Sequence, residues 1–211
     1  IFYANTGTND GLFGQDAQGW SDAVFGPRSP QFQDMLLESS LINDEVKNGG
    51  IRNIQGYTVY TTGHSWGELM GQAQTYTFGW TGVGYDGPGA GLVVSDSRFS
   101  TMLQAQNITA VGGTDFITVD TTGLGPMGGA FIGDIGANIS GTAQFNVTLP
   151  SSSQSGAFNI FTAAAGGVVA GLPGIVLGGV GGKVYTGVVL HDMSGINQAI
   201  QDGNFEPAGA N

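Results

Sequence analysis

A short run at residues 57–67 constrains the fold of this chain more than any other feature. Residues 57–62 are aromatic and β-branched without interruption, which predicts a short strand buried on both faces. Residues 63–67 read Gly-His-Ser-Trp-Gly and fit the G-x-S-x-G elbow. Apolar residues then recur at the i, i+3, i+4, i+7 spacing of a helix, at Trp66, Leu69, Met70 and Ala73. Strand, tight turn and helix in direct succession are the context that this motif needs.

In an elbow of this kind, Ser65 is a candidate nucleophile. The turn forces the serine into a strained backbone with its hydroxyl pointing outward, and the helix N-terminus stabilises developing negative charge. The chain holds 39 glycines, so the motif alone is a weak signal. The strand and helix on either side of it carry the prediction.

A serine nucleophile requires a general base within hydrogen-bond reach, and histidine is the best suited side chain. The chain has two histidines. His64 belongs to the elbow itself, where adjacent side chains point to different sides, and is interpreted as structural. His191 directly follows a predicted strand at residues 184–190 and is the predicted base.

The third member of such a triad is a carboxylate that lies between the serine and the histidine in sequence. The sequence offers five aspartates after predicted strands or in loops: Asp86, Asp96, Asp115, Asp120 and Asp134. Asp115 best matches a turn after a strand predicted at residues 108–111, with Asp120 as the alternative. This chemistry requires no metal ion and no cofactor.

The remaining elements predict an α/β protein with a mostly parallel sheet flanked by helices. Ser29 followed by Pro30 predicts a helix start, and Lys47 with Gly49 predicts its end. A strand at residues 1–4, this helix and the elbow strand then form a β–α–β unit, which implies parallel pairing. Further predictions are strands at 75–78, 108–111 (extended by 116–119) and 143–148, a loop at 79–91, helices at 95–105 and from Met193 to Gly203, and a frayed tail at 205–211.

The C-terminal part has a different character. Residues 121–182 are almost uncharged and glycine-rich, and predict a less regular insertion or lid within a single domain at 1–211. Residues 163–182 contain two G-x-x-x-G spacings, which are compatible with membrane insertion. Pro173 and the glycine content favour an apolar lid or a buried glycine-rich layer instead.

Charge and composition exclude several classes of function. Sixteen acidic against five basic residues give a net charge of −11, which argues against nucleic-acid binding and against docking on anionic membranes. The chain has no cysteine, hence no disulfide framework and no thiolate chemistry. This composition is typical of a secreted bacterial protein. Because the chain begins at Ile1 within a predicted strand, we expect a processed chain or a fragment from which earlier strands are missing.

The N-terminal motifs resemble those of class 3 lipases. The likeness covers residues 1–118 and rests on Gly7-Thr8 after a strand, on residues 19–22, on residues 62–67, and on the segments 75–78 and 86–89. It implies an α/β-hydrolase fold that acts on acyl esters. Ser65 would be the nucleophile, Asp115 the orienting acid and His191 the base, and the backbone N–H groups of Trp66 and Thr8 would form the oxyanion hole. The chain departs from the family pattern at Thr6, Trp66 and Glu68, where the family usually has Arg, Leu and Gly.

The sequence therefore predicts a secreted serine ester hydrolase that works through an acyl-enzyme. An apolar lid at 163–182 would favour lipid-like substrates. One alternative is a non-catalytic surface-layer or adhesin-type module with a degenerate hydrolase pattern, which the Gly, Thr and Asn content and the low charge favour. Another is a membrane-active protein that uses residues 156–182.

Overall fold

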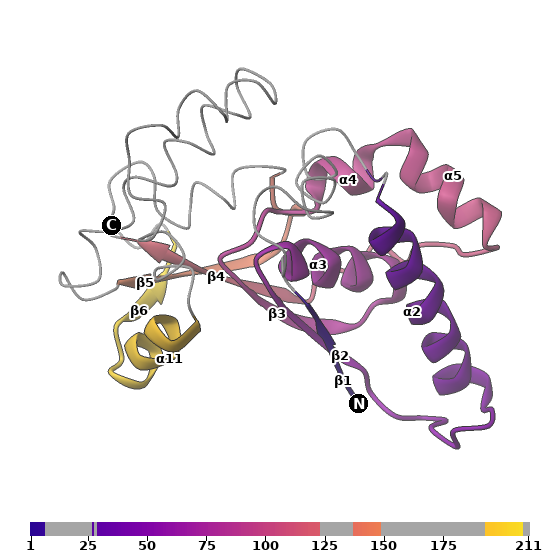
Figure 1. Cartoon of the computed structure of the whole chain (residues 1–211), viewed down its shortest axis with the longest axis horizontal. Helices are drawn as coiled ribbons and strands as arrows, with labels where there is room; N and C mark the ends of the chain where they lie inside the picture. Colours follow the sequence, from indigo (N-terminus) through magenta and orange to yellow (C-terminus); the bar gives the residue numbers. More distant parts are fainter. Residues whose placement is uncertain (7–26, 28, 123–136, 149–192, 209–211) are drawn as a thin grey trace. The chain divides into compact units, whose positions relative to one another are not determined.

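The computed structural model describes residues 1–6, 27, 29–122, 137–148 and 193–208 (Figure 1). Its contacts divide the chain into two compact units. The first comprises Ile1–Val119 with Gly133–Gln144, and the second Asp120–Ile132 with Phe145–Asn211. The predicted lid at 163–182 and the predicted strand at 184–190 lie outside the described residues, and the single domain stays a prediction.

The described strands form a mostly parallel sheet of six strands in the order β1-β2-β3-β4-β5-β6. The first four strands pair in parallel, and β5 and β6 pair antiparallel. Their bounds are β1 Phe2–Asn5, β2 Tyr60–His64, β3 Thr81–Tyr85, β4 Phe116–Thr122, β5 Ala143–Thr148 and β6 Phe205–Pro207. With the helices that flank the sheet, this confirms the predicted α/β class.

The first long helix confirms its predicted ends. Helix α2 spans Pro30–Asn48, and the hydroxyl of Ser29 accepts a hydrogen bond of 3.1 Å from the backbone N–H of Phe32. Proline in the first turn lacks an N–H that would have no partner there. The helix stops at Gly49, whose φ is 79° and therefore suits glycine. The other described helices are α3 Trp66–Phe78, α4 Gly91–Ser95, α5 Ser97–Ala105 and α11 Met193–Gln201.

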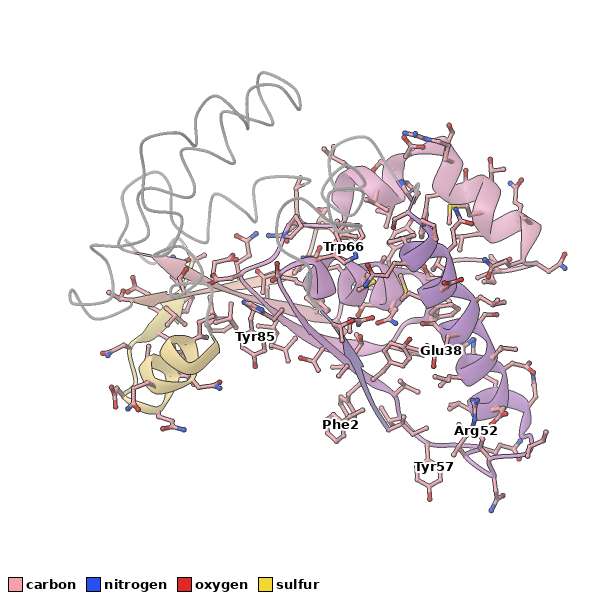
Figure 2. The ribbon with its side chains drawn as sticks, viewed as in Figure 1. Phe2, Glu38, Arg52, Tyr57, Trp66 and Tyr85 are labelled. Atoms are coloured by element: carbon pink, nitrogen blue, oxygen red, sulfur yellow. The ribbon has the colours of Figure 1, made fainter. Side chains whose placement is uncertain are left out.

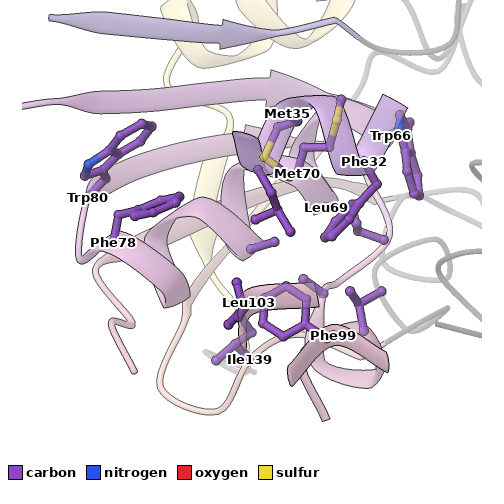
Figure 3. Packing of buried hydrophobic residues seen from close by; sticks show 14 of the residues in the cluster. Phe32, Met35, Trp66, Leu69, Met70, Phe78, Trp80, Phe99, Leu103 and Ile139 are labelled. Atoms are coloured by element: carbon purple, nitrogen blue, oxygen red, sulfur yellow. The ribbon is translucent and has the colours of Figure 1, made fainter. Parts of the chain in front are cut away.

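Helix α3 lies at the centre of the first unit. It packs on β1, β2 and β3 and contacts α2 and α4. The predicted apolar face of α3 is buried. Beside it, the ring of Phe32 from α2 lies edge-on to Phe99 from α5 at a centroid distance of 6.1 Å (Figure 3). The buried hydrophobic side chains form one cluster, which joins the described helices α2, α3, α4 and α5 to one face of the sheet. Burial on this scale is the main stabilising term for the unit.

On the other face of the sheet in this unit, large side chains of β1 and β2 are exposed. Phe2 is 83% exposed and its ring stacks on Tyr60 at 5.4 Å, pointing away from the helices (Figure 2). Strand β2 also begins only at Tyr60, and Tyr57 is exposed. The prediction of a strand at 57–62 buried on both faces is therefore wrong. When each parallel strand is added beside the previous one and the crossover connections are right-handed, the connecting helices all lie on the same face of the sheet.

Two adjacent predictions after the elbow are also wrong. Residues 75–78 continue α3, where the hydroxyl of Thr77 bonds to the carbonyl of Ala73, and the helix ends at Gly79 in a left-handed conformation. The predicted loop at 79–91 contains β3 instead. A Cβ on Gly82 would lie 2.6 Å from side-chain atoms of Phe116. This glycine marks close packing inside a sheet, which the sequence does not distinguish from a turn.

The later predictions have mixed outcomes. Residues 108–111 form no strand, and the strand lies at β4 instead. Residues 95–105 are largely helical in α5, and 143–148 form β5 as predicted. Helix α11 is confirmed and is followed by Gly203 at φ 75°. The tail is not wholly frayed, since β6 lies within it. No helix of the described residues is long and apolar enough to cross a membrane.

Candidate nucleophile elbow

Ser65 joins β2 to α3 in a backbone conformation that is rare for a residue with a side chain. Its φ is 59° and its ψ is −129°. Non-glycine residues in such regions are strained by about 1–3 kcal/mol and occur mainly at functional sites. The elbow predicted from the motif is therefore present as a structure: a strand, a strained serine and a helix in direct succession.

The two glycines of the motif are required by packing. A Cβ on Gly63 would lie 2.1 Å from the carbonyl carbon of Gly67, so the strand and the helix approach at backbone contact. A Cβ on Gly67 would lie 2.5 Å from the carbonyl oxygen of Asn5 on β1. The sharp turn at Ser65 is possible only because both positions lack side chains.

The prediction that the hydroxyl of Ser65 points outward is wrong, because Ser65 is only 2% exposed and its hydroxyl is buried. The hydroxyl makes no hydrogen bond within the described part of the chain. Trp66 is the first residue of α3, and the first N–H groups of a helix have no intrahelical acceptor. Its N–H can therefore donate to an anion that forms next to Ser65. Thr8, the other predicted oxyanion donor, lies outside the described residues.

Glu68, in the first turn of α3, has a hydrogen-bond partner outside the helix. Its carboxylate is fully buried, and its Oε2 accepts a hydrogen bond of 2.8 Å from the backbone N–H of Gly87. The side chain is therefore directed toward the loop that follows β3. A carboxylate in the first turn also interacts favourably with the helix dipole.

The structure separates Asp115 from Ser65. Asp115 immediately precedes β4, so the prediction that it follows a strand is wrong. Its carboxylate accepts a hydrogen bond of 2.6 Å from the hydroxyl of Thr81, at the amino end of β3. Ser65 follows the carboxyl end of β2. The first and last residues of a five-residue strand are about 13 Å apart, since each step along the strand adds about 3.3 Å. Asp115 therefore lies at the amino ends of the parallel strands, whereas Ser65 lies at their carboxyl ends. At that distance Asp115 cannot orient a base beside Ser65.

The other predicted aspartates occupy different positions. Asp96 caps α5 and forms an ion pair of 2.6 Å with Arg98, which accounts for it structurally. Asp86 directly follows β3 and is buried, with a φ of 47°. Asp120 lies on β4 one residue beyond Val119, the partner of Tyr85, and is also buried. Asp134 lies outside the described residues. Asp86 and Asp120 remain as buried carboxylates at the carboxyl ends of paired strand segments.

One of the two histidines, His64, lies within the described residues. His64 is the last residue of β2 and alternates with Gly63, so its side chain points to the sheet face opposite α3. This placement fits the interpretation of His64 as structural. His191, the predicted base, lies outside the described residues.

A second buried polar network centres on the side chain of Gln74 in α3. The side-chain amide of Asn5 donates to Gln74 Oε1 at 2.8 Å and to Thr61 Oγ1 at 3.0 Å. Gln74 donates in turn to the hydroxyl of Ser39 on α2 at 2.8 Å. The network links β1, β2, α3 and α2. Buried networks of this kind rigidify a core when all their groups are paired.

Tyr3 in β1 and Tyr85 in β3 have raised pKa values. Burial raises the pKa of Tyr85, whose carbonyl accepts the N–H of Ser65. Burial also raises the pKa of Tyr3 well above its usual range, and the hydrogen bond of 2.7 Å from its hydroxyl to Glu38 adds to the effect.

An open groove of about 540 Å³ lies in the same unit, at the other end of α3. Thr77 and Phe78 line it together with Lys47 of α2 and Asn107. Since α3 has 13 residues, this groove is about 18 Å from Ser65 at 1.5 Å per residue. Within the described ranges, no three His, Asp or Glu side chains gather as a metal site.

Sequence reasoning missed the partners of Glu68. The only signal for them was the departure from the family pattern at this position, together with glycines at 84 and 87 that leave room for a side chain. A Cβ on Gly84 would lie 2.3 Å from Glu68. These contacts depend on which loop folds against the helix, so they appear only in three dimensions.

Comparisons with protein-family models, with curated proteins and with solved structures found no match for this chain.

Proposed function

We propose that this chain is a serine-dependent hydrolase of carboxylic esters, with Ser65 as the nucleophile that forms an acyl-enzyme. The observation that carries the proposal is the strained backbone of Ser65, with φ 59° and ψ −129°, between a parallel strand and a helix. Ordinary glycine-rich turns place glycine, not serine, in such a conformation. The strain is retained here by glycines packed at backbone contact on both sides.

The proposed mechanism assigns a role to each remaining group. His191 takes the proton from the hydroxyl of Ser65 as the serine attacks the ester carbonyl, and later returns it to the leaving alcohol. The N–H groups of Trp66 and Thr8 stabilise the oxyanion. Asp120 or Asp86 replaces Asp115 as the acid that orients the histidine. A water molecule then hydrolyses the acyl-enzyme.

The substrate class and the location of the protein are proposed from the sequence. The apolar character of residues 163–182 favours lipid-like esters over small polar ones. The acidic, cysteine-free and glycine-rich composition, taken as a whole, is the basis for proposing a secreted bacterial protein.

A fluorophosphonate probe tests the proposal directly. The folded full chain is expected to be labelled at Ser65, with the site located by peptide mass, and Ser65→Ala is expected not to be labelled. A comparison of short-chain and long-chain nitrophenyl esters then tests the substrate class, and the proposal expects faster turnover of the longer chain.

A folded chain that the probe does not label would contradict the proposal. That outcome favours the non-catalytic module predicted as the alternative. The exposed aromatic rings of Phe2 on β1, of Tyr60 on β2 and of Tyr57 just before β2 support this second candidate, because such surfaces are common at protein contacts.

A further inference from the structure

The first turn of α3 carries a carboxylate that lies entirely inside the protein. Glu68 is 0% exposed, and its Oε2 accepts a hydrogen bond of 2.8 Å from the backbone N–H of Gly87. Its Oε1 accepts a second hydrogen bond, of 3.3 Å, from the side-chain amide of Gln72 one turn later. Burial of a carboxylate is unfavourable without such partners. These two hydrogen bonds, three residues after Ser65, indicate that Glu68 has a structural role at the start of α3.

Gln72 extends this contact to the far end of the same loop. Its Oε1 accepts hydrogen bonds from the backbone N–H groups of Ala90 at 3.1 Å and of Ile139 at 3.4 Å. Its amide nitrogen donates to Asn138 Oδ1 at 2.6 Å. Glu68 and Gln72 thus hold both ends of the loop at residues 86–90 on one face of α3.

This loop also packs directly against the candidate nucleophile. A Cβ on Gly87 would lie 2.2 Å from the carbonyl oxygen of Ser65, so the two backbones are in contact. The carbonyl of Tyr85, just before the loop, accepts the N–H of Ser65 at 2.9 Å. Asp86 within the loop has a φ of 47°. A displacement of the loop would therefore move the support of the strained serine.

We infer that Glu68 is a positioning residue, which together with Gln72 holds residues 86–90 against Ser65 and maintains its reactive backbone. The inference rests on the proposed function of Ser65. It explains why positions 84 and 87 are glycines, since side chains there would lie within 2.3 Å and 2.4 Å of Glu68 atoms. Strain of this kind persists only where surrounding contacts enforce it.

The experiment compares Glu68→Ala with Glu68→Gln in the full chain, and uses Gln74→Ala as a matched control. Gln74 is equally buried on α3 but bonds to Asn5 and Ser39, away from the loop. Two quantities are measured: amide hydrogen exchange at Gly87 and Ala90, and the rate of fluorophosphonate labelling as a function of probe concentration.

Glu68→Ala is expected to raise exchange at Gly87 about tenfold or more, because its acceptor is lost. The maximal labelling rate should fall about 10-fold to 100-fold at an unchanged half-saturating probe concentration, as expected for a displaced reacting group. Glu68→Gln keeps an acceptor oxygen and should restore most of the rate. Gln74→Ala should lower global stability and leave both quantities near wild type.

Unchanged exchange at Gly87 in Glu68→Ala would overturn the inference, as would equal effects of Gln74→Ala. If the wild type is not labelled but exchange at Gly87 responds, the hydrolase proposal fails and the loop-holding role stands. If the wild type is labelled and Glu68→Ala labels equally fast, only the inference fails. Should Glu68→Ala not fold, Gln72→Leu replaces it, with faster exchange at Ala90 and slower labelling expected; no change in either would reject the role.

Discussion

The backbone N–H of Ser65 donates a hydrogen bond of 2.9 Å to the carbonyl of Tyr85, while Ser65 itself has φ 59° and ψ −129°. The serine thus completes the pairing of β2 with β3 in a conformation that favours glycine. We expect Ser65→Gly to be more stable than Ser65→Ala by about 1–2 kcal/mol, because glycine relieves the strain. Urea unfolding measures the difference.

A matched pair in an ordinary helix provides the control for this prediction. Ser100 lies exposed within α5, where glycine is less stable than alanine by about 1 kcal/mol. The order of the two variants should therefore be reversed between positions 65 and 100. The same order at both positions would show that Ser65 is not strained.

The backbone contact between Gly63 and Gly67 gives a second prediction. A methyl group on Gly63 would lie 2.1 Å from backbone atoms that cannot rotate away. Gly63→Ala is expected to lose more than about 3 kcal/mol of unfolding free energy, or to fail to fold. Gly112 has nothing within 4 Å of its Cβ position and a φ of 73°, so Gly112→Ala should lose only about 1 kcal/mol. Similar losses at both sites would contradict the close packing of the elbow.

The carboxylates can be separated by their effect on labelling of Ser65. Asp115→Asn should leave the fluorophosphonate rate unchanged, because Asp115 bonds to Thr81 at the far edge of the strands. At least one of Asp86→Asn and Asp120→Asn should lower the rate by about 10³-fold or more, the scale expected when the orienting acid of a triad is lost. A loss caused by Asp115→Asn alone would reject this assignment.

The buried network around Gln74 should show strong coupling. Asn5→Ala and Gln74→Ala each remove a partner of the other, across 2.8 Å. Each is expected to cost about 1–3 kcal/mol, since buried groups are left without partners. The double variant should be more stable than the sum predicts by about 1–2 kcal/mol. Asn48→Ala, which breaks an exposed bond to Asp44, should change stability by less than about 0.5 kcal/mol. Additive losses would show that the network does not act as a unit.

The raised pKa of Tyr3 gives a prediction for the stability of the protein at alkaline pH. Its pKa is raised, first by burial and then by Glu38, so the folded state binds the phenolic proton more tightly than the unfolded state. Its contribution to stability is complete below the ordinary tyrosine pKa of about 10 and is lost as pH rises above it. Urea midpoints from pH 8 to 11 should fall less steeply for Tyr3→Phe than for wild type. Tyr57→Phe is the control, because Tyr57 is exposed and should leave the slope unchanged.

Local patterns were sufficient for several parts of the fold. The cap at Ser29, the stop at Gly49 and the helical spacing from Trp66 to Ala73 act within a few residues, so the sequence predicts them well. The elbow was predicted for the same reason, because glycines on both sides of a serine between a strand and a helix are a local requirement.

The failures share one cause, which is that strand and helix propensities are decided by distant contacts. Residues 75–78 have a strand-like composition but extend α3, where Thr75 and Thr77 are buried in the core. Gly82 and Gly84 suggest a loop but lie in β3 because Phe116 and Glu68 fill the space above them. No short window of sequence contains this information.

By itself, the sequence determined that a parallel α/β sheet would carry a strained serine at the start of a helix, because turn chemistry and apolar periodicity are local properties. Only the tertiary structure decided which carboxylates lie at the carboxyl ends of the strands, where that serine lies. The register of β3 and β4 places Asp115 beside Thr81 and leaves Asp86 at the carboxyl end of β3. The tertiary structure also decided that Glu68 points into the protein toward Gly87, because hydrogen bonds across 19 residues of chain form only when the loop folds back onto α3.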